Sequence, residues 1–259
     1  MNQADIFKFQ LLNEFSPKMP ENFGELTERD KLTLEYCGRN ILQKIQEDFP
    51  EGLPELVLFA DVSARPLVYV FGPALYQIAK SRGVKPPVLD TINIQKGSDY
   101  DIQALHTDSN KTEYFDFEDL LRQENTKKRD KLFNQHNLTN PEIILIDEFL
   151  SNGTTAREFL EVFGYNSKVY ILLKSNCSRK TLKNIFCAFY NPYPSFIVSD
   201  GFRYPGFDYR EMYKYEVLPY DKHVGHDVYE VIGSKNPFAL ARLYQGMLEI
   251  GLKLAAEIK

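Results

Sequence analysis

The 259-residue sequence has few cysteines and no long apolar run, and each shortage excludes a class of protein. Cys37, Cys177 and Cys187 are odd in number and far apart, which fits reduced, mostly buried thiols better than a disulfide framework or a zinc site. No apolar run approaches the ~18 residues that cross a membrane. The N-terminal residues include charged side chains such as Lys8 and lack a signal-peptide core. We therefore expect a cytoplasmic protein with no membrane partner.

The sequence also lacks an excess of basic residues, because its net charge is -5 at pH 7. This balance argues against a broad nucleic-acid surface, so we expect no nucleic-acid partner. A metal-like spacing occurs at His223-x-x-His226 with Asp227, but no further Cys or His supports it, so we expect no protein metal site. The hydrophobic content of 43% is enough for the core of one large domain or two modest ones.

The most informative stretch follows an Asn-Pro pair and ends at Ala156. Ile143–Ile146 is an unbroken aliphatic run, which predicts a strand that is buried on both faces and central in a parallel sheet. Asp147 and Glu148 end the run, a short polar loop follows, and residues 157–164 carry apolar side chains at helical spacing. The predicted order is strand, acidic tip, loop and helix.

That order suits a ribose phosphate as ligand. Gly153 lets the backbone approach a ligand closely, and Thr154 and Thr155 offer hydroxyls. The first N–H groups of the following helix attract an anion. Asp147 and Glu148 would repel a phosphate, but they can accept hydrogen bonds from the vicinal hydroxyls of a ribose. The natural ligand is therefore a ribose 5-phosphate; the alternative is an ordinary strand-to-helix turn with two solvated acids.

These residues resemble the phosphoribosyl-pyrophosphate (PRPP) signature of the type I phosphoribosyltransferases, which has four hydrophobic residues, two acids and a Gly-Thr loop. The resemblance covers Ile143–Thr155. It implies that Asp147 and Glu148 hold the ribose hydroxyls. It assigns the 5-phosphate to the loop residues Ser151, Asn152, Gly153, Thr154 and Thr155. Family loops usually carry Thr where Asn152 stands, and Asn can still donate to phosphate.

A second loop follows the strand predicted at Leu56–Ala60. In the family this loop binds pyrophosphate, so the resemblance implies that role for Arg65, whose planar fork matches phosphate, and for Ser63. Many members have glycine here, whereas none lies between Asp61 and Arg65. The alternative is that Arg65 is a surface charge beside a helix. Apolar residues from 67 to 78 have helical spacing, but Gly72-Pro73 should kink or split that helix. A short strand at 67–71 is therefore an alternative.

Strands and helices are predicted to alternate from Leu56 to Asp200. Further strands are predicted at Val88–Ile94, Lys168–Leu173 and Ser195–Asp200, and further helices at Thr27–Phe49 and Ser178–Phe189. This alternation indicates an α/β fold with a parallel sheet flanked by helices. Ligands of such sheets bind at the carboxyl ends of the strands, where Arg65, Asp147, Glu148 and Lys174 are expected.

Residues 96–140 are polar, charged and too long for a plain connection in a compact domain. The resemblance implies a mobile catalytic loop that closes over PRPP. The cations that such a lid would use are Arg122, Lys127, Lys128, Arg129 and Lys131. The alternative is the solvated face of a helix.

Residues 202–259 are rich in aromatic residues and turns, which predicts a small antiparallel or irregular C-terminal subdomain. The resemblance implies a hood over the site, with Phe202 and Lys174 as base-binding candidates; packing is the alternative role for the rings. A terminal helix from Asn236-Pro237 should bury one stripe against the core or against a second subunit in a homodimer. The stripe comprises Leu240, Tyr244, Met247, Leu248, Gly251, Leu252 and Ala255.

The predicted organisation is a helical segment at 1–54, a core at 55–201 with the insertion at 96–140, and the C-terminal subdomain at 202–259. Two functions fit it. The resemblance implies a phosphoribosyltransferase that transfers ribose 5-phosphate from PRPP, bound with Mg²⁺, to a nucleobase and releases pyrophosphate. The alternative is a non-catalytic nucleotide sensor, which the glycine-free first loop favours.

Overall fold

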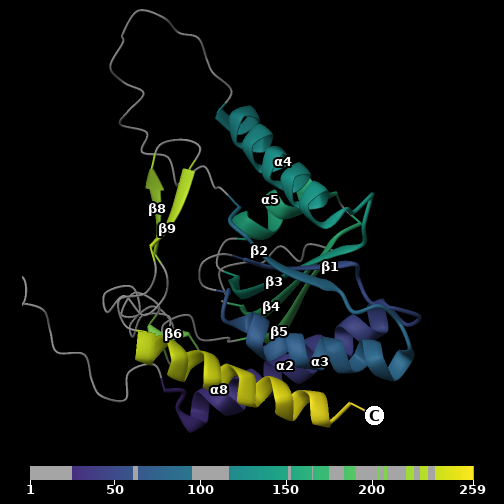
Figure 1. Cartoon of the computed structure of the whole chain (residues 1–259), viewed down its shortest axis with the longest axis vertical. Helices are drawn as coiled ribbons and strands as arrows, with labels where there is room; N and C mark the ends of the chain where they lie inside the picture. Colours follow the sequence, from purple (N-terminus) through teal and green to yellow (C-terminus); the bar gives the residue numbers. More distant parts are fainter. Residues whose placement is uncertain are drawn as a thin grey trace, which may run out of the picture.

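A computed structural model of the chain describes residues 25–60, 64–94, 117–150, 153–164, 166–174, 184–190 and 237–258, with short strands between 203 and 232 (Figure 1). Its centre is a five-stranded parallel sheet in the order β2-β1-β3-β4-β5. The strands are β1 Leu56–Ala60, β2 Val88–Ile92, β3 Ile143–Leu150, β4 Lys168–Lys174 and β5 Ile185–Tyr190. The predicted α/β class is confirmed, and β3 is central as expected.

Helices cover both faces of the sheet (Figure 1). One face carries α2 Glu28–Asp48 and α3 Leu67–Arg82, with α8 Pro237–Ala256 packed on both of them as an outer layer. The other face carries α5 Thr154–Phe163, with α4 Phe117–His136 packed on it. None of the helices in the described part of the chain is long and apolar enough to cross a membrane.

Helix α2 begins with a capping box. The Thr27 hydroxyl accepts a hydrogen bond from the backbone N–H of Asp30 at 3.2 Å, and the Thr27 N–H donates to Asp30 Oδ2 at 2.8 Å. Together these bonds satisfy polar groups that a helix start leaves without intrahelical partners. The apolar residues of this helix at helical spacing face the core: Leu34, Cys37, Ile41, Leu42 and Ile45 are buried, and Phe49 at its end is partly buried.

Helix α3 is continuous through Gly72-Pro73, so neither the predicted split nor a strand at 67–71 occurs. Proline at position 73 cannot donate to the carbonyl of Tyr69. Helix α8 covers this turn closely, since a Cβ placed on Gly251 would lie 2.3 Å from that carbonyl oxygen. Packing of one helix on the other therefore outweighs the local break.

The segment Ile185–Tyr190 is a strand, where the spacing of apolar residues predicted a helix. It pairs in parallel with β4, for example at Ile171↔Cys187. A short apolar run fits a helix face and an edge strand equally well, and pairing with β4 decided the outcome. The rest of that predicted helix, 178–183, and the predicted strand Ser195–Asp200 lie outside the described residues.

The terminal helix begins near Asn236-Pro237 as predicted, but the predicted stripe is partly wrong. Leu248 and Leu252 are 38% and 57% exposed. The residues buried against α2 and α3 are Ala239, Leu243, Met247, Ile250 and Leu254. The buried face is rotated because α8 packs into two neighbours at once, and Gly251 against α3 and Gly38 of α2 against Leu254 provide the closest approaches.

In the sequence between β5 and α8, the described residues form two antiparallel strand pairs, as expected for this region. Strand β6 Arg203–Tyr204 pairs with β7 Phe207–Asp208, and β8 Tyr220–Val224 pairs with β9 Val228–Ile232. The division of the chain at residue 202 stays a prediction.

Candidate functional site

The strand order reverses between β1 and β3. The chain leaves β1 through α3 to reach β2 on one side, and it leaves β3 through α5 to reach β4 on the other. Open α/β sheets bind their ligands at such a switch point, outside the carboxyl ends of the strands. Phe59 pairs with Ile146, so Ala60 at the end of β1 is level with Asp147. The edge at Ala60 and Asp147 is the candidate site.

Asp147 and Glu148 lie inside β3, which continues to Leu150, and not beyond its end as the sequence indicated. Both are buried, with 7% and 9% of their surface exposed. Asp147 Oδ1 accepts a hydrogen bond from the backbone N–H of Glu148 at 2.9 Å. The alternative of two solvated acids is therefore wrong, because these carboxylates are part of the folded edge.

The two acids point to opposite faces of the sheet. Ile146 pairs with Phe59, whose ring packs on Phe71 of α3, and with Tyr170, whose hydroxyl donates to Asp48 of α2. Ile146 therefore faces α2 and α3. Successive side chains of a strand alternate, and the register between β3 and β4 is constant from Ile144↔Lys168 to Leu150↔Lys174.

It follows that Asp147 faces the α4/α5 side of the sheet and Glu148 faces the α2/α3 side. This separation could not be predicted from the adjacent positions of the two acids, because it depends on how far the strand continues and on which helices cover each face.

Gly153 positions the start of α5. Its φ of 79° lies in the left-handed region, which glycine adopts at little cost, and Arg157 N–H donates to its carbonyl at 3.0 Å. The helix thus starts at Thr154, earlier than the predicted Arg157, and Thr154 and Thr155 lie in its first turn. Gly153 is the N-cap residue of α5, and among the described residues no side chain makes a capping hydrogen bond at this helix start. Ser151 and Asn152 lie outside the described residues.

A tight turn positions Arg65 at the start of α3. Ala64 N–H donates to the carbonyl of Ala60 at 3.0 Å, and the Arg65 carbonyl accepts from Val68 N–H at 3.2 Å. The Arg65 side chain is half-buried. The predicted Ser63 lies outside the described residues. Helices α3 and α5 therefore begin at neighbouring strand ends and on opposite faces of the sheet.

The base-binding candidates are less well placed. Lys174 ends β4 and pairs with Leu150, at the same edge as Asp147. Phe202 lies outside the described residues. The described part of the chain contains no group of three or more His, Cys, Asp or Glu residues able to hold a metal ion.

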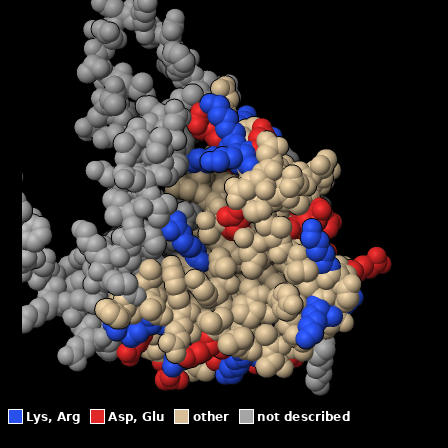
Figure 2. Space-filling view, in the orientation of Figure 1, with Lys and Arg blue, Asp and Glu red and all other residues tan. Residues whose placement is uncertain are grey.

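Four of the five cations of the predicted lid contact other residues of the chain. On α4, Arg122 pairs with Glu161 of α5 at 3.3 Å, and Lys128 Nζ donates to the Asn93 carbonyl at 2.9 Å. Arg129 donates to the carbonyl of Val162 at 2.8 Å. Lys127 pairs with Glu124, and Lys131 is exposed. Figure 2 shows charges of both signs over α4, which favours the solvated-helix interpretation for this part of the segment.

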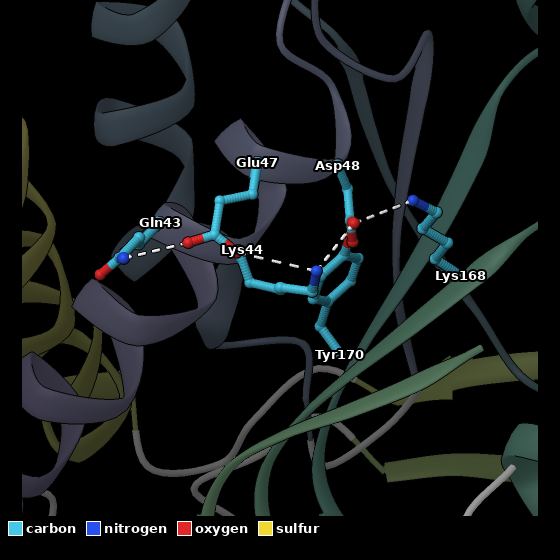
Figure 3. A network of polar contacts seen from close by, with 6 residues as sticks. All are labelled: Gln43, Lys44, Glu47, Asp48, Lys168 and Tyr170. Atoms are coloured by element: carbon cyan, nitrogen blue, oxygen red, sulfur yellow. Dashed lines mark hydrogen bonds and ion pairs between the residues drawn. The ribbon is translucent and has the colours of Figure 1, made fainter. Parts of the chain in front are cut away.

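A polar network that the sequence did not indicate lies at the opposite end of the sheet, where β4 begins (Figure 3). Asp48 Oδ1 lies 2.9 Å from Lys44 Nζ and 3.1 Å from Lys168 Nζ, and Asp48 Oδ2 accepts from the Tyr170 hydroxyl at 2.7 Å. Burial raises the pKa of Asp48, but the hydrogen bonds from Lys44, Tyr170 and Lys168 outweigh it and the net pKa is lowered. Burial and the neighbouring Asp48 raise the pKa of Tyr170.

The network joins the end of α2 to β4 and is remote from the switch point, so we assign it to stability.

No family model matches the sequence, and the search of curated proteins finds no match either. Membership of the phosphoribosyltransferase family stays a prediction.

Proposed function

We propose that the chain binds PRPP at the β1–β3 edge, transfers its ribose 5-phosphate to a nucleobase and releases pyrophosphate. The observation that carries the proposal is the coincidence of three features at one place. The topological switch point, two buried carboxylates and the starts of two helices meet at Ala60 and Asp147. Helix starts favour anions, and buried carboxylates accept sugar hydroxyls.

Each part of PRPP then has a place. The 5-phosphate would lie at the start of α5, against Gly153, Thr154 and Thr155. The pyrophosphate would lie at the start of α3, where Arg65 carries the fixed charge. Mg²⁺ bound with PRPP would neutralise the departing pyrophosphate, and carboxylate oxygens such as those of Asp147 are ligands that it accepts. Lys174 and Phe202 stay the base-binding candidates.

The reaction needs little covalent chemistry from the protein. The bond between the anomeric carbon and pyrophosphate breaks, pyrophosphate leaves with the electron pair, and a nitrogen of the base bonds to that carbon and loses its proton. Positive charge develops on the ribose during this exchange. Asp147, buried beside the ribose site, would stabilise that charge, and Arg65 would stabilise the negative charge on the leaving group.

The test is pyrophosphate release from PRPP across the common purines, pyrimidines and orotate. Arg65→Ala should lower turnover much more than it weakens binding of a nucleoside monophosphate, which has no pyrophosphate. One charge-assisted contact used mainly in the transition state is worth about 2–4 kcal/mol, or roughly 30- to 1000-fold in rate. The matched control is Arg39→Ala, which removes a half-exposed arginine of α2 that pairs with Glu257 and should leave turnover unchanged.

A non-catalytic nucleotide sensor is the second candidate, favoured by the absence of glycine between Asp61 and Arg65. A sensor would bind nucleotides tightly and release no pyrophosphate with any base. In that case Arg65→Ala would change ligand affinity alone.

A further inference from the structure

The opposite orientations of Asp147 and Glu148 have a direct chemical consequence. A ribose presents its two vicinal hydroxyls on one side of a small ring. Side chains on opposite faces of the sheet are separated by the strand itself, so a ribose that contacts Asp147 on the α5 side does not meet Glu148 in the same way. The two adjacent acids therefore need different roles.

Glu148 and Arg65 lie at the same edge of the sheet, because β3 and β1 are neighbouring strands and each residue follows the part of its strand that pairs with the other. Glu148 faces the α2/α3 side of the sheet, and Arg65 lies two residues before Leu67, the first residue of α3. Strand β1 ends at Ala60, level with Asp147 on the neighbouring strand about 4.8 Å away. Ala64 N–H is hydrogen-bonded to the Ala60 carbonyl at 3.0 Å, which returns the chain to this point just before Arg65. Arg65 and Glu148 are therefore carried by neighbouring strands at the same edge of the sheet.

Charge and burial favour pairing of these two residues. Glu148 is only 9% exposed and its Oε2 atom is buried, and a buried carboxylate is stable only with hydrogen-bond donors or a cation beside it. Arg65 is the cation of the turn Ala64–Pro66 and is half-buried. A guanidinium presents five donors in a plane, so it can bind a carboxylate on one edge and a phosphate on another.

We propose that the two acids serve different parts of the ligand. Asp147 contacts the ribose hydroxyls on the α5 side, whereas Glu148 is a positioning residue on the α3 side that orients Arg65 toward the pyrophosphate. This inference rests on the proposed function, and it changes the expected roles of the signature acids from a shared site to two separate ones.

The experiment titrates ribose 5-phosphate and inorganic pyrophosphate separately into the 259-residue protein with Mg²⁺, by calorimetry. Asp147→Asn should weaken ribose 5-phosphate about tenfold or more, and change pyrophosphate affinity less than about twofold. Glu148→Gln should do the reverse and match Arg65→Ala on pyrophosphate. The Glu148→Gln/Arg65→Ala double variant should bind pyrophosphate no more weakly than either single variant, because the two residues act as one unit.

Glu148→Asp keeps the charge and should bind pyrophosphate more tightly than Glu148→Gln does. A purely structural role of Glu148 would not predict this recovery. If Glu148→Gln does not fold, Glu148→Asp takes its place in the double-mutant cycle, and Arg65→Lys takes the place of Arg65→Ala. Equal loss of ribose 5-phosphate affinity in Asp147→Asn and Glu148→Gln, or additive losses in the cycle, would overturn the division of roles while leaving the proposed function intact. A folded wild type that binds PRPP, ribose 5-phosphate and pyrophosphate not at all overturns both.

Discussion

Gly153 is the residue on which the start of α5 most directly depends. Its φ is 79°, and a Cβ placed there would meet only Leu150 Cδ1, at an ordinary 3.7 Å. Gly153→Ala therefore introduces backbone strain without a clash. We expect it to lower the free energy of unfolding by about 1–2 kcal/mol in urea denaturation.

The matched control is Gly52→Ala, where no atom lies within 4 Å of the added Cβ and no positive φ is required. That change should be neutral within about 0.5 kcal/mol. Equal losses at the two glycines would show that the left-handed conformation at Gly153 is not the source of the effect.

Asp48 gives the fold a predictable dependence on pH. Its pKa is lowered from the ordinary 3.8, so its contribution to stability is present above that pH and is lost as the pH falls through the lower folded value. The unfolding free energy of the wild type should therefore fall more steeply between pH 5 and pH 2 than that of Asp48→Asn, which cannot titrate. Parallel profiles for the two proteins would contradict the assignment.

Individual residues were predictable where local chemistry decides: the short loop around Gly153 was expected to lead into a helix, and it does. The facing directions of Asp147 and Glu148 were not predictable. Alternation along a strand is general knowledge, but its starting phase is set by partners distant in sequence, here Phe71 and Asp48. For the same reason the sequence did not indicate the network around Asp48.

Helix α8 approaches α3 closely at Gly251. A Cβ at Gly251 would lie 2.3 Å from the Tyr69 carbonyl oxygen and 2.8 Å from that of Val70, and backbone atoms cannot move aside easily. Gly251→Ala should lower the free energy of unfolding by about 1–3 kcal/mol in urea denaturation.

Gly246 in the same helix is the control. There the nearest atom to an added Cβ is Leu26 Cδ1 at 3.0 Å, which is the tip of a flexible side chain. Because alanine also favours helix by about 1 kcal/mol over glycine, Gly246→Ala should be close to neutral or stabilising. A larger loss at Gly246 than at Gly251 would contradict the close approach of α8 to α3.

Elements were predictable where the apolar pattern allowed one structure, as with the helical spacing in α2 and the apolar runs in β1, β3 and β4. Helix α3 and strand β5 show the limit. In α3 the Gly72-Pro73 pair disfavours a helix locally, and packing under Gly251 maintains it. In β5 the apolar spacing allowed two structures, and the exposed edge of β4 selected the strand.

For the whole molecule, alternating elements predicted the α/β class and a parallel sheet with its polar residues at the carboxyl edge. The order β2-β1-β3-β4-β5 was not predicted, because it depends on the side of the sheet to which each helix returns the chain. That order places the switch point between the Arg65 turn and the two acids. Because ligands of open α/β sheets bind at the switch point, the topology supports the site independently of the signature.

The central claim is that this edge binds a ribose phosphate, and calorimetric titration of PRPP with Mg²⁺ tests it most directly. Wild type should bind saturably, and the Asp147→Ala/Glu148→Ala double variant should not bind while it still unfolds cooperatively. Glu51→Ala, which removes an exposed acid before β1, should bind as the wild type does. No binding by folded wild type, or unchanged affinity in the double variant, would contradict the account.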